Sequence, residues 1–399
     1  MNKPKIRFKG FEGEWEEKKL GEITTSYSGG TPTAGYTEYY GGDIPFIRSG
    51  EIHENKTELY LTATGFNMSS AKMVEEGTIL YALYGATSGD VAISKIKGAI
   101  NQAILAIIPT KDVESEFLAQ FLQANKKAIV SELLQGGQGN LSGALVKNID
   151  VRFPPSKEQT TIIEFLSNLD TLITSSASRL ASLKQMKAAS LQAMFPQEGE
   201  TVPKIRFKGF EGEWEKVKLE KILMERHEVS TITQDFPQLS FTIADGVIRP
   251  EDRKSNKRDF LIKDIDNKRY LVTRKDDIIY NPANVVYGAI HRNALCNGVV
   301  SPIYKIFYTE QNATFIECSV RRPNFITKLA MCTEGTVTKL KTLKPEAFLC
   351  MEIMLAPSLP EQQAIASYFT TLDKQIALQT QRLEKLKQIK AACLDKMFV

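Results

Sequence analysis

Two long stretches of the chain repeat apolar residues at alternating spacings of three and four, and neither contains Pro or Gly. They cover residues 156–195 and 361–399. Spacing of this kind predicts two long helices whose apolar seams pair as a coiled coil. The alternative is two amphipathic helices that pack separately, each on its own domain. The predicted seam residues are Leu166, Leu169, Ile173, Leu180 and Leu183 in the first helix, and Phe369, Leu372, Ile376, Leu383 and Leu386 in the second.

Both helices have recognisable beginnings and the same unusual length. Ser156 with Gln159, and Ser358 with Glu361, have the spacing of capping boxes. At 1.5 Å per residue, 38 residues form a rod of about 57 Å. A polar residue interrupts each seam at the equivalent place, Ser176 in one and Gln379 in the other. This shared interruption favours mutual packing of the two helices.

The regions between these helices read as mixed α and β. "GTILYALYG", "GDVAISKI" and "INQAILAIIP" alternate or run apolar between glycines and prolines, as strands do, and "DDIIYN", "GAIHRNALCNG" and "SPIYKIFY" follow the same order later. One helix is predicted over residues 115–134, with a counterpart in residues 317–335. We therefore expect an α+β fold with two α/β domains of about 140 residues each.

The chain is built twice. Residues 4–16, "PKIRFKGFEGEWE", are identical to residues 203–215, and residues 158–195 match residues 361–398 at 17 of 38 positions without a gap. Such an internal repeat predicts a pseudo-two-fold frame in which the two long helices run antiparallel. The predicted parts are a first domain (1–155), a first long helix (156–196), a second domain (197–357, with the repeat at 203–215) and a second long helix (358–399).

Composition narrows the class of protein only slightly. The chain has 399 residues, 42% of them apolar, and a formal net charge of +4. A signal peptide and a membrane-spanning run are not expected, and five cysteines without a C-x-x-C pair fit a cytoplasmic protein.

Known catalytic motifs are not found. The chain has no G-x-x-x-x-G-K-[ST] loop, no G-x-S-x-G elbow and no H-E-x-x-H pair. "NPAN" at residues 281–284 lacks the second proline and the aromatic residue of an amino-methyltransferase motif. These features favour a non-catalytic binding protein with no metal site. A DNA methyltransferase with degenerate motifs, and a coiled-coil adaptor that binds only protein, remain as alternatives.

Polar loops in both domains carry side chains suited to base edges, because Arg pairs with guanine and Asn or Gln with adenine in the major groove. Residues 249–275 add ten Lys or Arg and five Asp or Glu, which could meet phosphates or form an exposed mixed-charge hairpin. The candidate DNA-binding residues are Thr31, Arg48, Ser49, Tyr84, Thr87, Gln135, Gln138, Asn140, Asn281, Asn284, Tyr287, Arg292, Thr336 and Lys339.

These features together resemble the specificity subunit of type I restriction-modification systems, over the whole chain. The resemblance is carried by F-x-G-F-x-G-x-W, "GGTP...YYGGDIPFIRSGEI", "INQAILAI", "QGNLS...V-x-F-PPS-x-EQ-x-x-I" and the duplicated helix that contains Leu-Asp. The second domain departs from the pattern because it lacks a GGTP counterpart, which leaves its loop residues less well defined.

The resemblance implies a function and a set of partners. Each domain would be a target recognition domain that reads one half of a bipartite double-stranded DNA site, and the coiled coil would set the spacing. Two modification subunits with S-adenosylmethionine would dock on the helices. Two restriction subunits, which are motor-nucleases that use ATP and Mg, would join them. This chain itself would bind no cofactor and no membrane.

Overall fold

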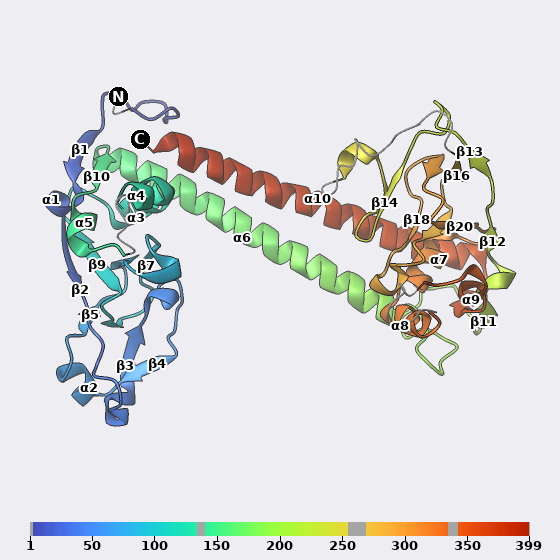
Figure 1. Ribbon diagram of the computed structural model, residues 1–399, viewed down its shortest axis with the longest axis horizontal. Coiled ribbons are helices and arrows are strands. Elements are labelled where there is room, and N and C mark those ends of the chain that lie inside the picture. Colours follow the sequence, from blue (N-terminus) through green and yellow to red (C-terminus); the bar gives the residue numbers. More distant parts are fainter. Residues whose placement is uncertain (1–2, 134–139, 254–268, 334–341, 399) are drawn as a thin grey trace. The chain divides into compact units, whose positions relative to one another are not determined.

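The structure is a computed structural model, and it describes residues 3–133, 140–253, 269–333 and 342–398. The chain divides into two compact units: residues 1–177 with 381–399, and residues 178–380. Figure 1 traces both units along the sequence. Among the described residues, no helix has the length and apolarity that crossing a membrane would require. Each unit is described by itself below.

Two long helices, α6 (Ser156–Ala193) and α10 (Leu359–Met397), each contribute to both units. In the first unit, Lys390 Nζ lies 2.5 Å from Asp170 Oδ1; in the second, Lys187 Nζ lies 2.5 Å from Asp373 Oδ1. These ion pairs are equivalent in the 203-residue repeat. In each unit, therefore, the early part of one long helix packs antiparallel against the late part of the other, as the repeated sequence predicted.

The seam positions of both helices are turned away from solvent. Seven of the ten predicted seam residues are buried, and Ile173, Ile376 and Leu386 are half-buried. The polar seam residues Ser176 and Gln379 are also buried, and neither lacks a partner.

The first unit places two four-stranded sheets and one two-stranded ribbon beside its part of the long helices. The sheet orders are β2-β9-β6-β7, β4-β3-β8-β5 and β1-β10. Its elements are β1 (Glu16–Lys19), α1 (Leu20–Ile23), β2 (Thr24–Ser28), η1 (Thr37–Tyr39), β3 (Tyr40–Ile47), η2 (Ser49–Glu51), β4 (Leu59–Leu61), α2 (Ala63–Asn67), β5 (Lys72–Val74), β6 (Ile79–Ala82), η3 (Gly85–Thr87), β7 (Val91–Ile93), β8 (Gly98–Ile100), β9 (Ile104–Pro109), α3 (Ser115–Ala124), α4 (Lys126–Leu133), α5 (Gly143–Lys147) and β10 (Asp150–Phe153).

The second unit repeats the larger part of this plan. Its sheet β12-β20-β17-β18 has the order of β2-β9-β6-β7, and its ribbon β11-β21 has the place of β1-β10. Its other sheets are β13-β16-β19 and β14-β15. The elements are β11 (Glu215–Lys218), η4 (Leu219–Lys221), β12 (Met224–Glu225), β13 (Val229–Ser230), β14 (Ser240–Thr242), β15 (Gly246–Ile248), η5 (Pro250–Asp252), β16 (Tyr270–Thr273), β17 (Ile278–Tyr280), η7 (Val285–Tyr287), β18 (Ile290–Arg292), β19 (Gly298–Val300), β20 (Lys305–Tyr308), α7 (Ala313–Val320), α8 (Pro323–Met331), α9 (Pro345–Leu349) and β21 (Glu352–Leu355).

The leading repeat, residues 4–16 and 203–215, ties each unit to the start of a long helix. Arg7 forms a bidentate ion pair with the buried Glu158, at 2.7 and 2.8 Å, and donates to the carbonyls of Gly13 and Glu12. In the second unit Arg206 does the same with Glu361, Gly212 and Glu211. The arginine thus closes the turn of the repeat and fixes it on the helix.

Aromatic side chains complete the same joint in each unit. Trp15 packs edge-on against Phe117, which also contacts Phe398 near the end of α10. Trp214 packs against Phe195, just beyond the end of α6, and against Phe315. Phe398, from the end of the second repeat, therefore packs in the core of the first unit, and Phe195, from the end of the first repeat, packs in the core of the second unit.

Four local predictions were wrong: two predicted helices are divided and two predicted capping boxes do not close. The helix expected in residues 317–335 is divided between α7 and α8, which begins at Pro323. The helix expected over residues 115–134 ends at Ala124: Asn125, with φ −92° and ψ 3°, leaves the helical conformation, its side-chain amide donates to the carbonyl of Phe121, and α4 begins after it. Ser358 does accept from the N–H of Glu361, but the Glu361 carboxylate binds Arg206 instead of closing a capping box.

Gln159 does not close a capping box either. Its side-chain amide donates to the carbonyl of Pro154, and its oxygen accepts from the N–H of Glu114. Gln362 holds Ala356 and Asn312 in the same way. In both units this glutamine fastens the long helix to the segment before α3 or α7.

Candidate nucleic-acid interface

A hairpin loop of equal length stands at the same place in each unit. β6 and β7 pair with Ile79 opposite Ile93, while β17 and β18 pair with Ile278 opposite Arg292. Each pair of positions is shifted by 199 residues from its counterpart, so residues 83–90 and 282–289 are equivalent loops. Five candidate DNA-binding residues lie on or beside these loops, and the structure brings them to equivalent edges: Tyr84, Thr87, Asn281, Asn284 and Tyr287.

The loop of the second unit is shaped by its own backbone. Asn281 Oδ1 accepts from the N–H of Ala283 at 3.0 Å, and the carbonyl of Asn284 accepts from the N–H of Tyr287. Gly288, with φ +83°, lets the chain turn back into β18. Tyr287 is thereby left 72% exposed, with its ring available for stacking or groove contacts.

Arg48 is already engaged within the first unit. Its guanidinium donates to Glu51 at 3.0 Å and to Glu58 at 2.6 Å, and these hydrogen bonds raise its pKa. Partial burial of Glu51 acts to raise the pKa of that carboxyl, but the hydrogen bonds from Arg48 and the Glu58 backbone prevail and lower it to about 2. A bidentate contact between Arg48 and guanine would require these ion pairs to break. Ser49, half-buried beside it, is therefore more readily available to contact a base.

Arg292 is held in a similar way in the second unit. Its Nη1 lies 2.5 Å from Asp276 Oδ1 and its Nε lies 3.6 Å from Glu317 Oε2. Both arginines that sequence reasoning assigned to bases therefore have acidic partners in the chain, which a local sequence pattern does not reveal.

Thr31 has a partner that sequence reasoning missed. Its hydroxyl donates to Gln102 Oε1 at 2.6 Å, which places Gln102 beside the loop that follows β2. Gln102 belongs to the "INQAILAI" motif, and its amide is as well suited to adenine as the residues that were predicted. The sequence feature that could have identified Gln102 is its position as a polar residue just before the apolar strand β9.

The remaining candidates follow α4 and α8 in the sequence. Asn140 is exposed. Gln135, Gln138, Thr336 and Lys339 lie outside the described residues, as does the part of the basic segment between 254 and 268.

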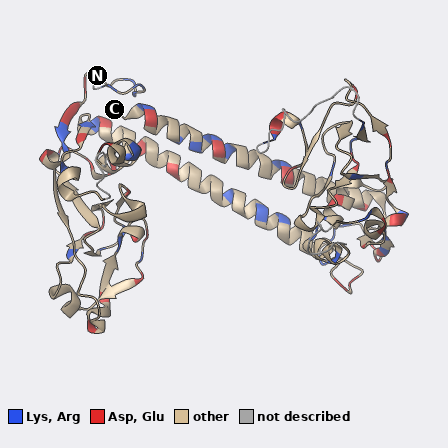
Figure 2. Cartoon of the chain, viewed as in Figure 1, with Lys and Arg blue, Asp and Glu red and all other residues tan. Residues whose placement is uncertain are grey.

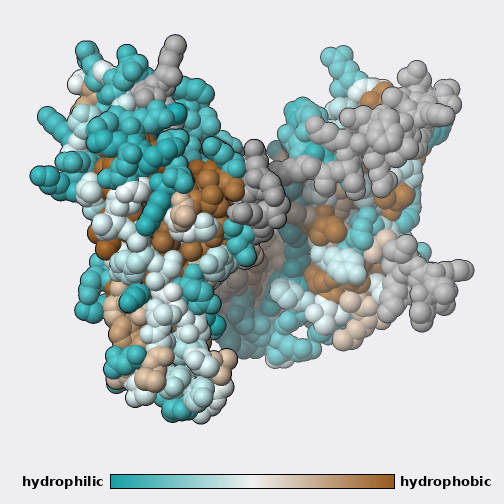
Figure 3. All heavy atoms as spheres, turned by 60° about the vertical axis from the view of Figure 1, so that its left-hand side comes forward, coloured by the Kyte–Doolittle hydropathy of each residue, from teal (hydrophilic) through white to brown (hydrophobic). Residues whose placement is uncertain are grey.

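Among the described residues, side chains of both charges occur over each unit. Figure 2 shows Lys and Arg interspersed with Asp and Glu in each unit, and Figure 3 shows the forward face of the first unit as largely hydrophilic with an apolar band across its middle. For the described residues, this distribution favours contacts by particular side chains over a broad positive field in an interface with DNA.

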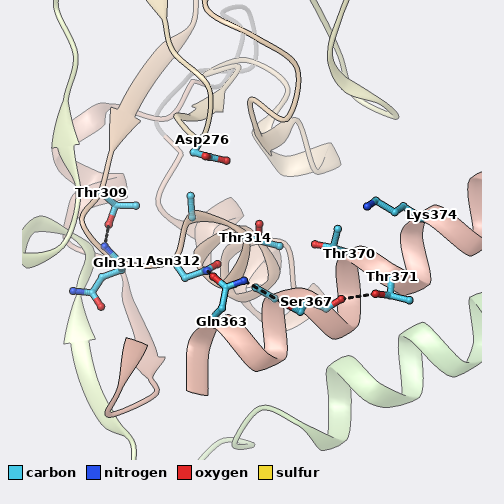
Figure 4. Close-up of a pocket in the computed structure, with 12 residues that line it drawn as sticks. Asp276, Thr309, Gln311, Asn312, Thr314, Gln363, Ser367, Thr370, Thr371 and Lys374 are labelled. Carbon is cyan, nitrogen blue, oxygen red and sulfur yellow. Dashed lines mark hydrogen bonds between the residues drawn. The ribbon is translucent and has the colours of Figure 1, made fainter. Parts of the chain in front are cut away.

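Each unit also has a groove between a long helix and the first helix after its sheet. In the second unit the groove encloses about 570 Å³. Its lining includes Asn312, directly before α7, and Thr370 and Lys374 of α10 (Figure 4). In the first unit, Glu116, Ser167 and Thr171 line the equivalent groove between α3 and α6. Among the described residues, no hydroxyl group of either lining is hydrogen-bonded to a carboxylate or a histidine. The described residues also form no cluster of His, Cys, Asp and Glu that could hold a metal ion.

Comparisons with known proteins agree with the repeated architecture. The sequence profile described as the type I restriction modification DNA specificity domain matches residues 12–185 and again residues 211–388. The solved S subunit of a type I restriction-modification system from M. genitalium has a TM-score of 0.61 and 14% identity, with 100% of this chain and 99% of that chain covered. This likeness shows that the fold is shared.

Curated relatives match over one part of the chain. The MjaIX specificity subunit of Methanocaldococcus jannaschii is 31% identical over 168 residues, which are 40% of this chain and 39% of that protein. The EcoR124I/EcoR124II specificity subunit of Escherichia coli is 27% identical over 173 residues, which are 41% and 43%. The chain thus spans about two fifths of the length of these relatives. Because the family profile covers most of the sequence in two copies, the chain belongs to the type I restriction modification DNA specificity family.

Proposed function

We propose that this chain is the DNA specificity subunit of a type I restriction-modification complex. Each unit contributes one target recognition domain that reads one half of a bipartite DNA site. One observation carries the proposal: the same joint and the same four-stranded sheet occur in both units, while the loops at the sheet edge differ in sequence. A repeated frame with two different loop sets suits the reading of two different half-sites.

The chemistry of the complex is assigned to partner subunits. Two modification subunits carry S-adenosylmethionine, and two restriction subunits use ATP and Mg. The chain itself acts without catalysis, by binding DNA and positioning these partners. The absence of the known catalytic motifs from the sequence supports this division of roles.

Replacement of one recognition domain tests the proposal. Exchanging residues 17–153 for the corresponding domain of another family member should change one half of the methylated sequence and preserve the other half. The chimera would be expressed with the modification subunit, and the methylated motif would be read by sequencing genomic DNA. The matched control is the exchange of residues 216–355, which should change the opposite half. A change in both halves after either exchange would contradict the modular reading.

The long helices are proposed to set the distance between half-sites. Inserting one heptad in α6 and one in α10 at equivalent positions adds about 10.5 Å of helix, or about three base pairs at 3.4 Å each. The methylated motif should then have a longer non-specific gap with unchanged half-sites. A heptad keeps the seam in register, whereas a control insertion of five residues should abolish methylation. An unchanged gap after the heptad insertion would rule out a spacing role.

A further inference from the structure

Each unit has two segments that are placed to contact a half-site. One is the hairpin loop, residues 83–90 in the first unit and 282–289 in the second. The other follows a strand that is paired in parallel, and in the first unit it is residues 48–53, which include Arg48 and Ser49. Two segments can read one half-site together only if their relative position is fixed.

The second unit has a counterpart of residues 48–53, and strand pairing identifies it. Phe46 pairs in parallel with Ala99 in the first unit, and Gln238 pairs in parallel with Val299 in the second. The segment that follows this pairing in the second unit is residues 240–246. Each of these two segments is called the flanking segment of its unit below.

A carboxylate at the end of the first hairpin loop contacts the flanking segment. His53 donates from Nε2 to Asp90 Oδ2 at 2.9 Å, and Lys126 of α4 donates to Asp90 Oδ1 at 3.3 Å. Lys95 in turn donates to the carbonyl of His53 at 2.6 Å. Burial acts to raise the pKa of the Asp90 carboxyl, but the hydrogen bonds from His53 and Lys126 prevail and lower it. Asp90 is therefore charged at neutral pH, and it connects the hairpin loop, the flanking segment and α4.

The second unit makes the same kind of connection with different residues. His291, in the strand that leaves the hairpin loop, donates from Nε2 to the carbonyl of Ile243 in the flanking segment at 2.8 Å. Its Nδ1 lies 3.6 Å from Oε1 of Glu317 in α7, and the same oxygen accepts from the N–H of Arg292 at 3.1 Å. The His291 side chain is buried against Gly246, where a Cβ would lie 2.7 Å from the Cγ of the ring.

The internal repeat does not account for these two connections. Asp90 corresponds to Ala289, and His291 corresponds to Ala92. The charges are also reversed, because the carboxylate belongs to the hairpin in the first unit and to the helix in the second. Two different sets of side chains thus connect a hairpin, its flanking segment and a helix. Recurrence without sequence identity indicates that the connection itself is required.

We propose that Asp90 and His291 are positioning residues for DNA recognition. On the proposed function, on which this inference rests, each of them fixes a hairpin loop against its flanking segment, so that both segments contact one half-site in a constant geometry. In the first unit the loop carries Tyr84, and the flanking segment carries Arg48 and Ser49. Asp90 and His291 act through such neighbours, because their own side chains are engaged within the unit.

The test in the first unit measures discrimination between DNA sequences. The complex of the chain with its modification subunit would methylate a cognate duplex, and duplexes with one changed base pair in either half-site, under single-turnover conditions. Asp90→Ala should reduce discrimination at the half-site of the first unit by about tenfold, because a displaced loop loses its base contacts. Discrimination at the other half-site should be unchanged. The exchange of residues 17–153 described above identifies which half-site belongs to the first unit.

Two further variants separate positioning from a general loss of structure. His53→Ala should give the same loss as Asp90→Ala, and the double variant should lose no more, because the two side chains form one connection. Asp90→Asn, which keeps the shape of the side chain and an acceptor for His53, should retain more discrimination than Asp90→Ala.

The test in the second unit should affect the opposite half-site. His291→Leu should reduce discrimination there, whereas His291→Gln, which can still donate to the carbonyl of Ile243, should retain most of it. Thermal unfolding of every variant is measured separately. If His291→Leu lowers the melting temperature, Glu317→Gln takes its place, since it keeps the size of the side chain and removes the charge that faces His291. The same loss at that half-site is expected.

An exposed ion pair of the first unit provides the matched control. Glu75 lies 2.8 Å from Lys97 and precedes β6, whereas the hairpin loop follows β6. Glu75→Ala should leave discrimination at both half-sites as in the wild type.

Three results would overturn the proposal: wild-type discrimination in Asp90→Ala, an equal loss at both half-sites, or weaker DNA binding with unchanged discrimination. In the last case Asp90 would serve affinity alone. A wild-type complex that methylates no bipartite site would instead overturn the proposed function.

Discussion

Replacement of Arg206 by alanine is expected to lower the free energy of unfolding of the second unit by about 3–5 kcal/mol. Glu361 is 1% exposed, and Arg206 supplies both hydrogen bonds of its bidentate ion pair. Without the arginine, a buried carboxylate loses its countercharge and the turn of the repeat loses its ties to Gly212 and Glu211. The measurement is urea denaturation followed by Trp214 fluorescence in a Trp15→Phe background.

A surface ion pair of the same unit serves as the control. Lys216 lies 2.6 Å from Glu352, but both side chains are exposed. Lys216→Ala should therefore leave the urea concentration at the unfolding midpoint close to that of the parent, because a solvent-exposed ion pair contributes little to stability. Adding Glu361→Gln to Arg206→Ala should recover part of the loss, because the unpaired charge is removed. A loss below 1 kcal/mol for Arg206→Ala would show that water or rearrangement satisfies Glu361.

The long helices and the two-fold repeat were predictable because their signals are dense and local. Leu169 and Leu372, for example, belong to apolar series that extend over nearly five turns, and only a helix satisfies such a series. The alternating apolar runs predicted three strands of each of the two equivalent sheets by the same reasoning: β6, β7 and β9 in the first unit, and β17, β18 and β20 in the second. A helix or strand can be predicted from the sequence when its own apolar spacing is sufficient to identify it.

Long-range polar pairing was not predictable. Arg7 and Glu158 are 151 positions apart, and their pairing depends on how the chain folds back. The predicted role of Glu361 in a capping box failed because a distant arginine outcompeted the helix end for its carboxylate. The base-reading candidate Arg48 shows the same limit on a shorter scale, since Glu51 and Glu58 occupy its guanidinium.

The placement of the candidate interface was partly readable. Tyr84 and Tyr287 follow strongly apolar strands, so their position on exposed hairpin loops could be inferred from strand ends. The pairing of Thr31 with Gln102 could not, because it joins two loops through a sheet whose strand order the sequence does not state. Side-chain direction at a loop is set by tertiary contacts, which single-sequence patterns do not encode.

Phe398→Ala is expected to destabilise the first unit by about 3–5 kcal/mol, although the residue stands at the end of the sequence. Its ring is buried against Phe117 and Phe121. Removing the ring should leave a cavity beneath α3 and accelerate amide hydrogen exchange in residues 115–124. The equivalent change, Phe195→Ala, should instead accelerate exchange in residues 313–320, because Phe195 stacks on Phe315. Met186→Ala, at an exposed helix position, is the control and should leave exchange in both segments unchanged. Equal exchange rates in Phe398→Ala and wild type would show that the first unit folds without the packing of Phe398.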